Sequence, residues 1–165
     1  MSNVIPNENS WIGFVPGTLL HKFGVINFAA PTAAEVNAAI DVTDYLVNIN
    51  ATTTGNTVPT PRLKSLFETS IPGTAAAQFT GEFYRDDEND LAWLTFPRRT
   101  SGSMLIKRFG GTGAGFKPAV GQTVEVWPIT IVSRAGSALQ SGSAQMFTLT
   151  GSVPKEPQED AIVAA

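Results

Sequence analysis

Short runs of alternating apolar and polar residues, separated by turn-forming residues, fill the second half of this 165-residue chain. A period of two residues is typical of β-strands, whereas the glycine, serine and acidic residues between the runs favour turns. The pattern predicts a mainly β fold, a β-sandwich or partial barrel, whose sheet edges must be covered or paired. The predicted strands are Gln78–Arg85, Leu91–Arg98, Ser103–Phe109, Gln122–Arg134 and Gln145–Val153.

The first half of the chain carries a weaker strand pattern and one helix signal. Gly17–Ala29 and Asp41–Asn50 are predicted as strand regions. Between them, Pro31–Ile40 is predicted as one short flanking α-helix. Thr32 and Glu35 within it have the T-x-x-E spacing of a capping box, in which each side chain satisfies an unpaired backbone N–H group.

Proline, glycine and threonine interrupt this pattern in the middle of the chain. Ala51–Pro61 is predicted as a long loop and Ile71–Ala77 as a turn, while Arg62–Thr69 fits either a short strand or a helical turn. Pro128 interrupts the long run around it, which predicts an edge strand or a bulge there, because proline cannot donate a hydrogen bond to a neighbouring strand.

The ends of the chain are polar and differ from the middle. We expect a flexible N-terminal arm over residues 1–16, a single β domain over residues 17–153 and a flexible C-terminal tail over residues 154–165. The apolar run Trp11–Val15 is too short for a membrane span or a signal core, and no basic residue precedes Lys22. We therefore expect no membrane association and synthesis in a cytoplasm.

Composition argues against several kinds of site. The chain has no cysteine, which excludes disulfides and thiolate metal ligands, and its net charge of −3 predicts no general basic surface for nucleic acid. His21 is the only histidine and has no nucleophile motif near it. Gly110–Lys117 lacks the Walker spacing, because Phe116 separates the last glycine from the lysine. We assign no catalytic, cofactor-binding or metal-binding residue.

An acidic loop follows the strand predicted at Gln78–Arg85. Its alternate carboxylates have the 1-3-5 spacing of a calcium loop, but Leu91 stands where that loop needs glycine and Pro97 where it needs glutamate. A solvated hairpin loop is therefore the simpler interpretation, with a weak cation site as the alternative. The residues of this acidic loop are Asp86, Asp87, Glu88 and Asp90.

Basic and aromatic residues leave two further alternatives open. The pairs Arg98–Arg99 and Lys107–Arg108 are either solvated or form salt bridges between chains. Trp11, Trp93 and Trp127 are flanked by apolar residues, which favours a core or an interface, whereas exposed and coplanar rings would instead bind sugars.

Several segments resemble the major tail tube proteins of long-tailed (siphovirus-type) bacteriophages, particularly those of actinobacterial hosts. Pro31–Leu46 (PTAAEVNAAIDVTDYL) is similar to a helix start that leads into an acidic strand in that family. The acidic turn Arg85–Asp90, the strand Val126–Arg134 (VWPITIVSR) and the closing Met146–Pro154 (MFTLTGSVP) add to a likeness that covers most of Gly17–Pro154.

The resemblance implies a structural protein without enzymatic activity or cofactor. In such proteins, rings of six subunits stack into a hollow tube, the sheets of neighbouring subunits join, and DNA passes through the lumen without specific binding. The implied partners are further copies of the chain and other tail proteins, namely the tape measure, terminator and tail-tip proteins. The implied location is the virion tail, after assembly in the host cytoplasm. The alternatives are another tail ring component, such as a terminator or tail-tip protein, and a carbohydrate-binding β-sandwich.

Under this resemblance, two segments are expected to join subunits. The predicted loop Ala51–Pro61 would reach a neighbouring ring, and the predicted hairpin Leu91–Phe109 would pair with the sheet of a neighbour. The candidate contact residues are Thr52, Thr53, Thr54, Gly55, Asn56, Thr57, Leu94, Phe96, Ile106 and Arg108.

Overall fold

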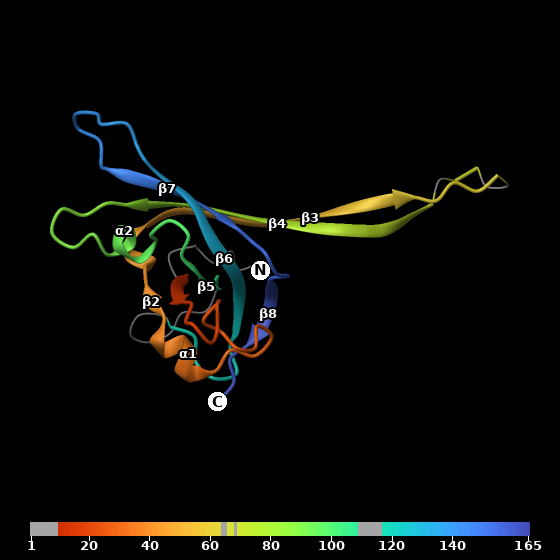
Figure 1. Cartoon of the computed structure of the whole chain (residues 1–165), viewed down its shortest axis with the longest axis horizontal. Helices are drawn as coiled ribbons and strands as arrows, with labels where there is room; N and C mark the ends of the chain where they lie inside the picture. The colour runs from red at the N-terminus through yellow and green to blue at the C-terminus, as the bar shows by residue number, and fades with distance from the viewer. Residues whose placement is uncertain (1–9, 64–65, 68, 109–116) are drawn as a thin grey trace, which may run out of the picture.

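One antiparallel sheet forms most of the protein, in a computed structural model that describes residues 10–63, 66–67, 69–108 and 117–165. The strand order is β2-β1-β5-β6-β7-β4-β3, the path does not close on itself, and β8 pairs with β6 outside it (Figure 1). The elements are β1 (Trp11–Pro16), α1 (Ala33–Ala38), β2 (Ile40–Asp41), η2 (Thr43–Tyr45), β3 (Leu46–Pro59), β4 (Ser70–Tyr84), α2 (Leu91–Thr95), β5 (Ser101–Lys107), β6 (Thr123–Gly136), β7 (Met146–Ser152) and β8 (Gln158–Ile162). The predicted mainly β fold is confirmed.

The core consists of two apolar clusters on opposite faces of β1, β5 and β6. Successive side chains of a strand point to opposite faces, so Met104 and Ile106 of β5 enter one cluster and Leu105 the other. The phenylalanines of β4 and β7 cover the first cluster, together with residues in and after α2. Val36 of α1 and Ala161 of β8 cover the second. The central strands are therefore buried on both sides.

Helix α1 forms where its capping box predicts. The Thr32 hydroxyl accepts a hydrogen bond from the Glu35 backbone N–H at 3.3 Å, and the Glu35 carboxylate accepts one from the Thr32 N–H at 2.8 Å. Val36 then points into the second cluster and is fully buried. The helix is confirmed, although it spans Ala33–Ala38 and is therefore shorter than the predicted range Pro31–Ile40.

Four predicted strands of the second half are confirmed, namely those within Gln78–Arg85, Ser103–Phe109, Gln122–Arg134 and Gln145–Val153. The strand predicted at Leu91–Arg98 is wrong, because this segment contains helix α2.

Helix α2 forms because the same apolar residues also satisfy helical spacing. Ala92 and Phe96 lie four residues apart and are both fully buried, whereas Leu94 between them is 72% exposed. The Thr95 hydroxyl also donates to the Leu91 carbonyl oxygen at 2.7 Å, within the helix. A run of only five residues does not distinguish the two periodicities.

The predictions for the start of the chain need correction. Residues 11–16 are not part of a flexible arm, since β1 lies between β2 and β5 and its apolar side chains are buried on both faces. A continuous apolar run such as Trp11–Val15 is typical of a fully buried strand. The prediction for residues 1–9 lies outside the described residues. Gly17–Ala29 is a loop rather than a strand, held by the Gly17 N–H on the Ser101 carbonyl oxygen at 2.8 Å.

Residues 154–165 are not a loose tail. Strand β8 pairs with the first half of β6, and Ala161 and Val163 complete the second cluster. Thr32 forms a parallel bridge with Ala164, which ties the segment to the start of α1. The apolar run from Ala161 onward is short and does not alternate, and acidic and proline residues precede it, so the sequence carries no clear strand signal here.

The largest correction concerns the middle of the chain. Ala51–Pro61 is not a loop and Ile71–Ala77 is not a turn, because β3 and β4 pair from Leu46↔Phe83 to Pro59↔Ser70. The β-branched threonines there favour extended backbone despite the neighbouring prolines. The prediction of a short strand or a helical turn at Arg62–Thr69 lies partly outside the described residues. Asp41–Asn50 divides into β2, a 3-10 turn and the start of β3.

Pro128 lies in the interior of the sheet and not at its edge. It is opposite Ser103 of β5 on one side of β6. On the other side, the partner of β6 changes from β8, up to Val126, to β7, from Thr130 onward. Proline is accommodated because it stands in the gap between these two partners, where the ladder is interrupted.

Candidate assembly surfaces

The chemical sites considered in the sequence find no support among the described residues. No three histidine, aspartate or glutamate side chains there are placed to hold a metal. In the acidic loop, Asp90 accepts hydrogen bonds from the Arg85 guanidinium, one of them at 3.0 Å, and Asp86 accepts the Glu88 backbone N–H at 3.1 Å. These carboxylates therefore accept hydrogen bonds from groups within the same loop. Gly110–Lys117 lies almost wholly outside the described residues. No helix in the described part is long and apolar enough to cross a membrane.

The tryptophans do not form a sugar-binding platform. Trp11 and Trp127 are fully buried in the two clusters. Trp93 lies between two guanidinium groups, with Arg85 at 4.0 Å and Arg134 at 3.8 Å from its ring centroid. Both faces of the only accessible indole are thus occupied by the chain's own cations, which fixes α2 to β4 and β6.

The basic pair Lys107–Arg108 is used within the chain. The Lys107 ammonium is buried and donates to the Gln122 side-chain oxygen at 2.8 Å, and burial lowers its pKa. Arg108 forms a salt bridge with Glu125, and this hydrogen bond raises the pKa of the guanidinium. Arg108 is therefore a surface residue with an internal partner. Arg98 and Arg99 are exposed.

The hairpin expected at Leu91–Phe109 does not supply a free sheet edge. Strand β5 is paired on both sides, with β1 and with β6. Phe96 and Ile106, two of the candidate contact residues, are buried in the first cluster. The prediction that this hairpin joins the sheet of a neighbour is wrong. Leu94, on the outer face of α2, is the one apolar candidate in this region that is exposed.

The remaining candidates, Thr52 to Thr57, lie on a two-stranded ribbon that projects from the body, at the right of Figure 1. We call the described part of residues 52–77 the arm; its shaft is formed by residues 52–59 and 70–77, and its tip by residues 60–63, 66–67 and 69. Strand β4 pairs with β7 only from Gln78 onward, so the shaft strands pair only with each other. Almost every residue of the shaft is exposed, on both faces of the ribbon.

The open edge of the sheet runs along β3. No other described strand pairs with the outer side of β3 over Leu46–Pro59. The outer side of β8, in contrast, is covered by the chain, since Ile162 and Ala164 donate to the carbonyl oxygens of Ala29 and Pro31 at 3.2 and 2.8 Å. Unpaired strand edges are the places where another chain can add. The sheet edge that the sequence predicts must be covered or paired is therefore the outer edge of β3.

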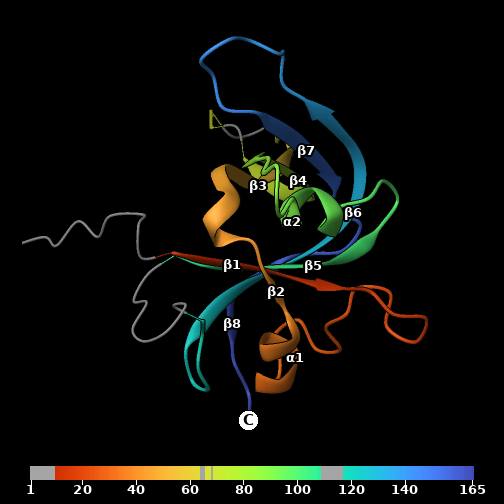
Figure 2. The same ribbon diagram turned by 90° about the vertical axis from the view of Figure 1, so that its left-hand side faces the viewer.

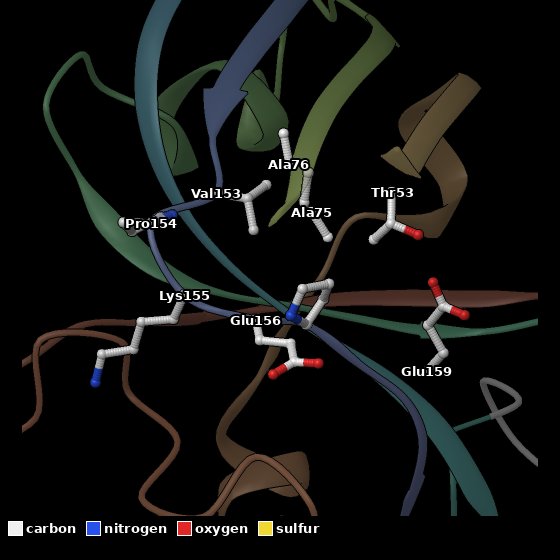
Figure 3. A pocket seen from close by; sticks show the side chains of 10 residues that line it. Thr53, Ala75, Ala76, Val153, Pro154, Lys155, Glu156 and Glu159 are labelled. Carbon is white, nitrogen blue, oxygen red and sulfur yellow. The ribbon is translucent and has the colours of Figure 1, made fainter. Parts of the chain in front are cut away.

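A groove opens at the root of the arm, where β4 leaves the body (Figure 3). Small side chains of the arm face the segment that connects β7 to β8, leaving a hollow of about 780 Å³. Lys155 on this segment points away, toward the rings of Phe23 and Phe28, with its ammonium 5.3 and 5.6 Å from their centroids. The groove residues are Thr53, Ala75, Ala76, Ala77, Val153, Pro154, Lys155, Glu156, Pro157 and Glu159.

Residues 52–57 on one strand of the arm were identified from the sequence as contact candidates. Neither the partner strand nor the groove was identified. A signal was present, because residues 46–61 and 69–81 contain no charged side chain, whereas the residues between them include Arg62, Lys64 and Glu68. Two uncharged segments of similar length around a short charged one are the pattern of a long hairpin with a polar end.

Comparisons with known proteins agree with this architecture. A family model described as "Phage tail tube protein" matches residues 3–165. No curated protein sequence is detectably similar to the chain. A solved chain in the 6-fold symmetrised baseplate of the anti-feeding prophage (AFP) is 11% identical, with 96% of each chain covered and a TM-score of 0.57.

Two further solved chains come from gene transfer agent (GTA) particles. One, from the tail of an empty GTA particle with C6 symmetry, is 9% identical, with 96% of this chain and 100% of that chain covered and a TM-score of 0.57. The other, from a native GTA virion, is 10% identical, with 98% and 100% covered and a TM-score of 0.55. At such identities the likeness concerns the fold.

Proposed function

The chain belongs to the phage tail tube protein family, and from this premise we propose that it is a structural subunit that assembles with its own copies into stacked hexameric rings. The stack forms a hollow conduit through which the genome leaves the particle. The similar solved structures include a tail with C6 symmetry and a 6-fold symmetrised baseplate, which supports six subunits in each ring.

The arm is the observation that carries this proposal. An isolated two-stranded hairpin is marginally stable in water, since it has no third strand and no apolar face to bury. The shaft exposes both faces and leaves the outer edge of β3 unpaired. Ring formation would cover these surfaces, with the β3 edge paired to the sheet of a neighbour and the arm laid along it.

The rest of the proposed role follows from composition and surface. The net charge of −3 disfavours a tight grip on phosphates, so DNA passes the lumen without specific binding. The protein has a structural and not an enzymatic role. Its partners are its own copies and the tape measure, terminator and tail-tip proteins of the same tail, and assembly takes place in the host cytoplasm before the tail becomes part of the virion.

A second candidate is a ring component at one end of the tail, since one of the similar solved chains belongs to a baseplate. The two roles differ in what the purified protein does. A tube subunit polymerises into long tubes with a continuous lumen, whereas a terminator or tail-tip protein stops at a single ring.

Electron microscopy of the purified full chain tests the proposal, and an arm-less variant tests the contribution of the arm. Thr52 and Gln78 are directly opposite, so replacing residues 53–77 by Asn-Gly closes a two-residue hairpin without changing the register of the body. We expect long tubes with six-fold end views from the full chain. The arm-less variant should give a folded monomer with unchanged near-UV circular dichroism and no tubes. Single rings from the full chain would favour the terminator or tail-tip role, and tubes of normal length from the variant would exclude the arm as an assembly element.

A further inference from the structure

The tip of the arm carries two leucines, Leu63 and Leu66, whose side chains are exposed. Leu63 and Leu66 are as exposed as they would be in an extended peptide, at 110% and 103%. Arg62 beside them is exposed as well. Exposed apolar side chains at the end of a projecting element offer a surface that a partner can cover.

The groove at the root of the arm has the complementary chemistry. Its walls combine the methyl groups of Ala75 to Ala77 and the side chains of Val153, Pro154 and Pro157 with polar groups of Thr53, Glu156 and Glu159. Its hollow of about 780 Å³ falls within the ~300–1,000 Å³ of typical binding clefts. Glu156 and Glu159 add negative charge at its border (Figure 3). Neither glutamate takes part in a salt bridge among the described residues, although Glu159 contributes to the negative potential at Arg108.

We propose that the arm tip of one copy inserts Leu63 and Leu66 into the groove at the arm root of the next copy, with Arg62 facing Glu156 and Glu159. This inference rests on the proposed function, since it names the surfaces through which the subunits join. Leucine side chains fit a hollow lined by alanine, valine and proline, and the guanidinium fits the carboxylates.

The geometry makes this contact head-to-tail. The groove is lined by the root of the shaft, at Thr53 and Ala75 to Ala77, whereas Leu63 and Leu66 follow the far end of the shaft, which spans roughly 26 Å for eight residues at ~3.3 Å each. A copy therefore cannot fill its own groove with a straight arm. Each copy donates one tip and accepts one, and such a heterologous contact repeats into a closed ring or an open helix.

The groove also couples one contact to the next. Part of its wall is the shaft itself, at Thr53 and Ala75 to Ala77. A tip that docks there adds packing to a shaft whose residues, apart from Ala77, are exposed, and so fixes the direction of the acceptor's own arm. Each copy that joins prepares the arm on which the following copy depends, which makes growth cooperative.

Cross-linking in the cysteine-free chain tests which surfaces meet. Leu63→Cys and Ala76→Cys are made in separate copies, mixed, assembled and oxidised. We expect disulfide-linked dimers from this mixture and none from Leu20→Cys mixed with Ala76→Cys, where Leu20 is a similarly exposed leucine, 89% accessible, on a different loop. Cross-linking of assembled material no greater than in this control would overturn the inference.

Substitution of the anchor tests its contribution. The double change Leu63→Ser and Leu66→Ser should raise the critical concentration for assembly by more than about tenfold, because burying one leucine is worth at least that factor. The matched control, Leu19→Ser and Leu20→Ser, should leave it unchanged. Arg62→Glu should weaken assembly, and Glu156→Arg in the same chain should restore it.

The outcomes separate the inference from the proposed function. An unchanged critical concentration in the tip variant, with wild-type tubes present, overturns the inference alone. A wild-type chain that stays monomeric at all concentrations overturns the proposed function, and the inference with it.

Discussion

Strand β5 and the outer half of β3 have the same backbone conformation but different reasons to adopt it. From Gly102 to Lys107, every residue of β5 is buried, and the strand is paired on both sides. From Thr52 to Pro59, every residue of β3 is exposed, and the strand is paired on one side only. Apolar burial fixes β5, whereas β-branched side chains and a single hydrogen-bonded neighbour hold the arm.

The two regions are therefore under different physical constraints. In the centre, a change of one methyl group meets packed neighbours, so residue size and shape are constrained. In the shaft, almost every described side chain is exposed, so a change of size there meets few neighbours within the subunit. The predictions below test whether the two regions are as independent as this comparison requires.

Hydrogen exchange should show the largest difference. In the monomer, the shaft amides of β3 should exchange with opening free energies close to zero, while those of β5 should require global unfolding, typically ~5–15 kcal/mol. Mass spectrometry of deuterium uptake measures both. After assembly, protection should rise in residues 52–77 and stay constant in β5. Equal protection of arm and centre in the monomer would contradict the comparison.

Phe83→Ala should strongly destabilise the body. Phe83 is fully buried, with ring centroids of Phe96 and Phe147 at 5.3 and 5.5 Å, so the change leaves a cavity and should cost about 3–5 kcal/mol. Val58→Ala on the arm is the matched apolar truncation and should stay within about 0.5 kcal/mol. Urea unfolding followed by tryptophan fluorescence gives both values, and a cost for Val58→Ala near that of Phe83→Ala would show that the arm has a core of its own.

Two glycines give a smaller and more exact test. At Gly102 of β5, an added Cβ would lie 2.4 Å from the Phe14 ring and 2.5 Å from the Val15 carbonyl oxygen. Gly102→Ala should therefore destabilise by about 1–3 kcal/mol. At Gly55 of the arm, nothing lies within 4 Å, and Gly55→Ala should be neutral or stabilise by a few tenths of a kcal/mol. Thermal unfolding of the two variants compares them directly.

The smallest effect is expected for Lys107, a buried lysine at the end of β5. Lys107→Met should be neutral or stabilise by about 1 kcal/mol near neutral pH, because it removes the desolvation cost of the ammonium. The Gln122 side-chain oxygen keeps the Ala119 N–H as a donor at 2.9 Å.

The pH dependence gives the sign of this effect. Burial lowers the pKa of Lys107 from 10.5, so between the folded pKa and 10.5 the unfolded chain binds more protons and wild-type stability rises with pH. The advantage of Lys107→Met should shrink over that window. Urea midpoints measured at several pH values check this, and an advantage that grows with pH would contradict it.

The sequence predicted the body better than the arm for physical reasons. The part of β4 from Gln78 onward, strands β5 to β7 and the capping box of α1 follow from alternation and local hydrogen bonding, which a single sequence displays. Helix α2 was missed because Ala92 and Phe96 fit both periods, and the exposed Leu94 between them completes a strand-like alternation in the sequence. Strands β1 and β8 were missed because their apolar residues form short continuous runs without alternation.

The candidate contact residues also divide between the arm and the body. Thr52 to Thr57 are exposed on the arm, although the segment was expected to be a loop. Phe96 and Ile106, in contrast, are buried in the first cluster. The sequence alone did not indicate this, because which of two apolar faces points inward depends on layers contributed by distant strands. The groove joins the arm root to residues 153–159, a long-range proximity for which no local signal exists.

The absence of ionisable side chains from the shaft has a consequence for how any contact along it responds to pH. Residues 46–61 and 69–81 contribute no charge of their own, so acidification neutralises no group of theirs and salt screens none. Ion pairs weaken at high salt and carboxylates are neutralised in acid, whereas methyl groups and backbone hydrogen bonds have no charge to lose. An assembly joined through this arm would therefore take its pH dependence from the charges that meet the tip and from those of the partner surface, and not from the shaft.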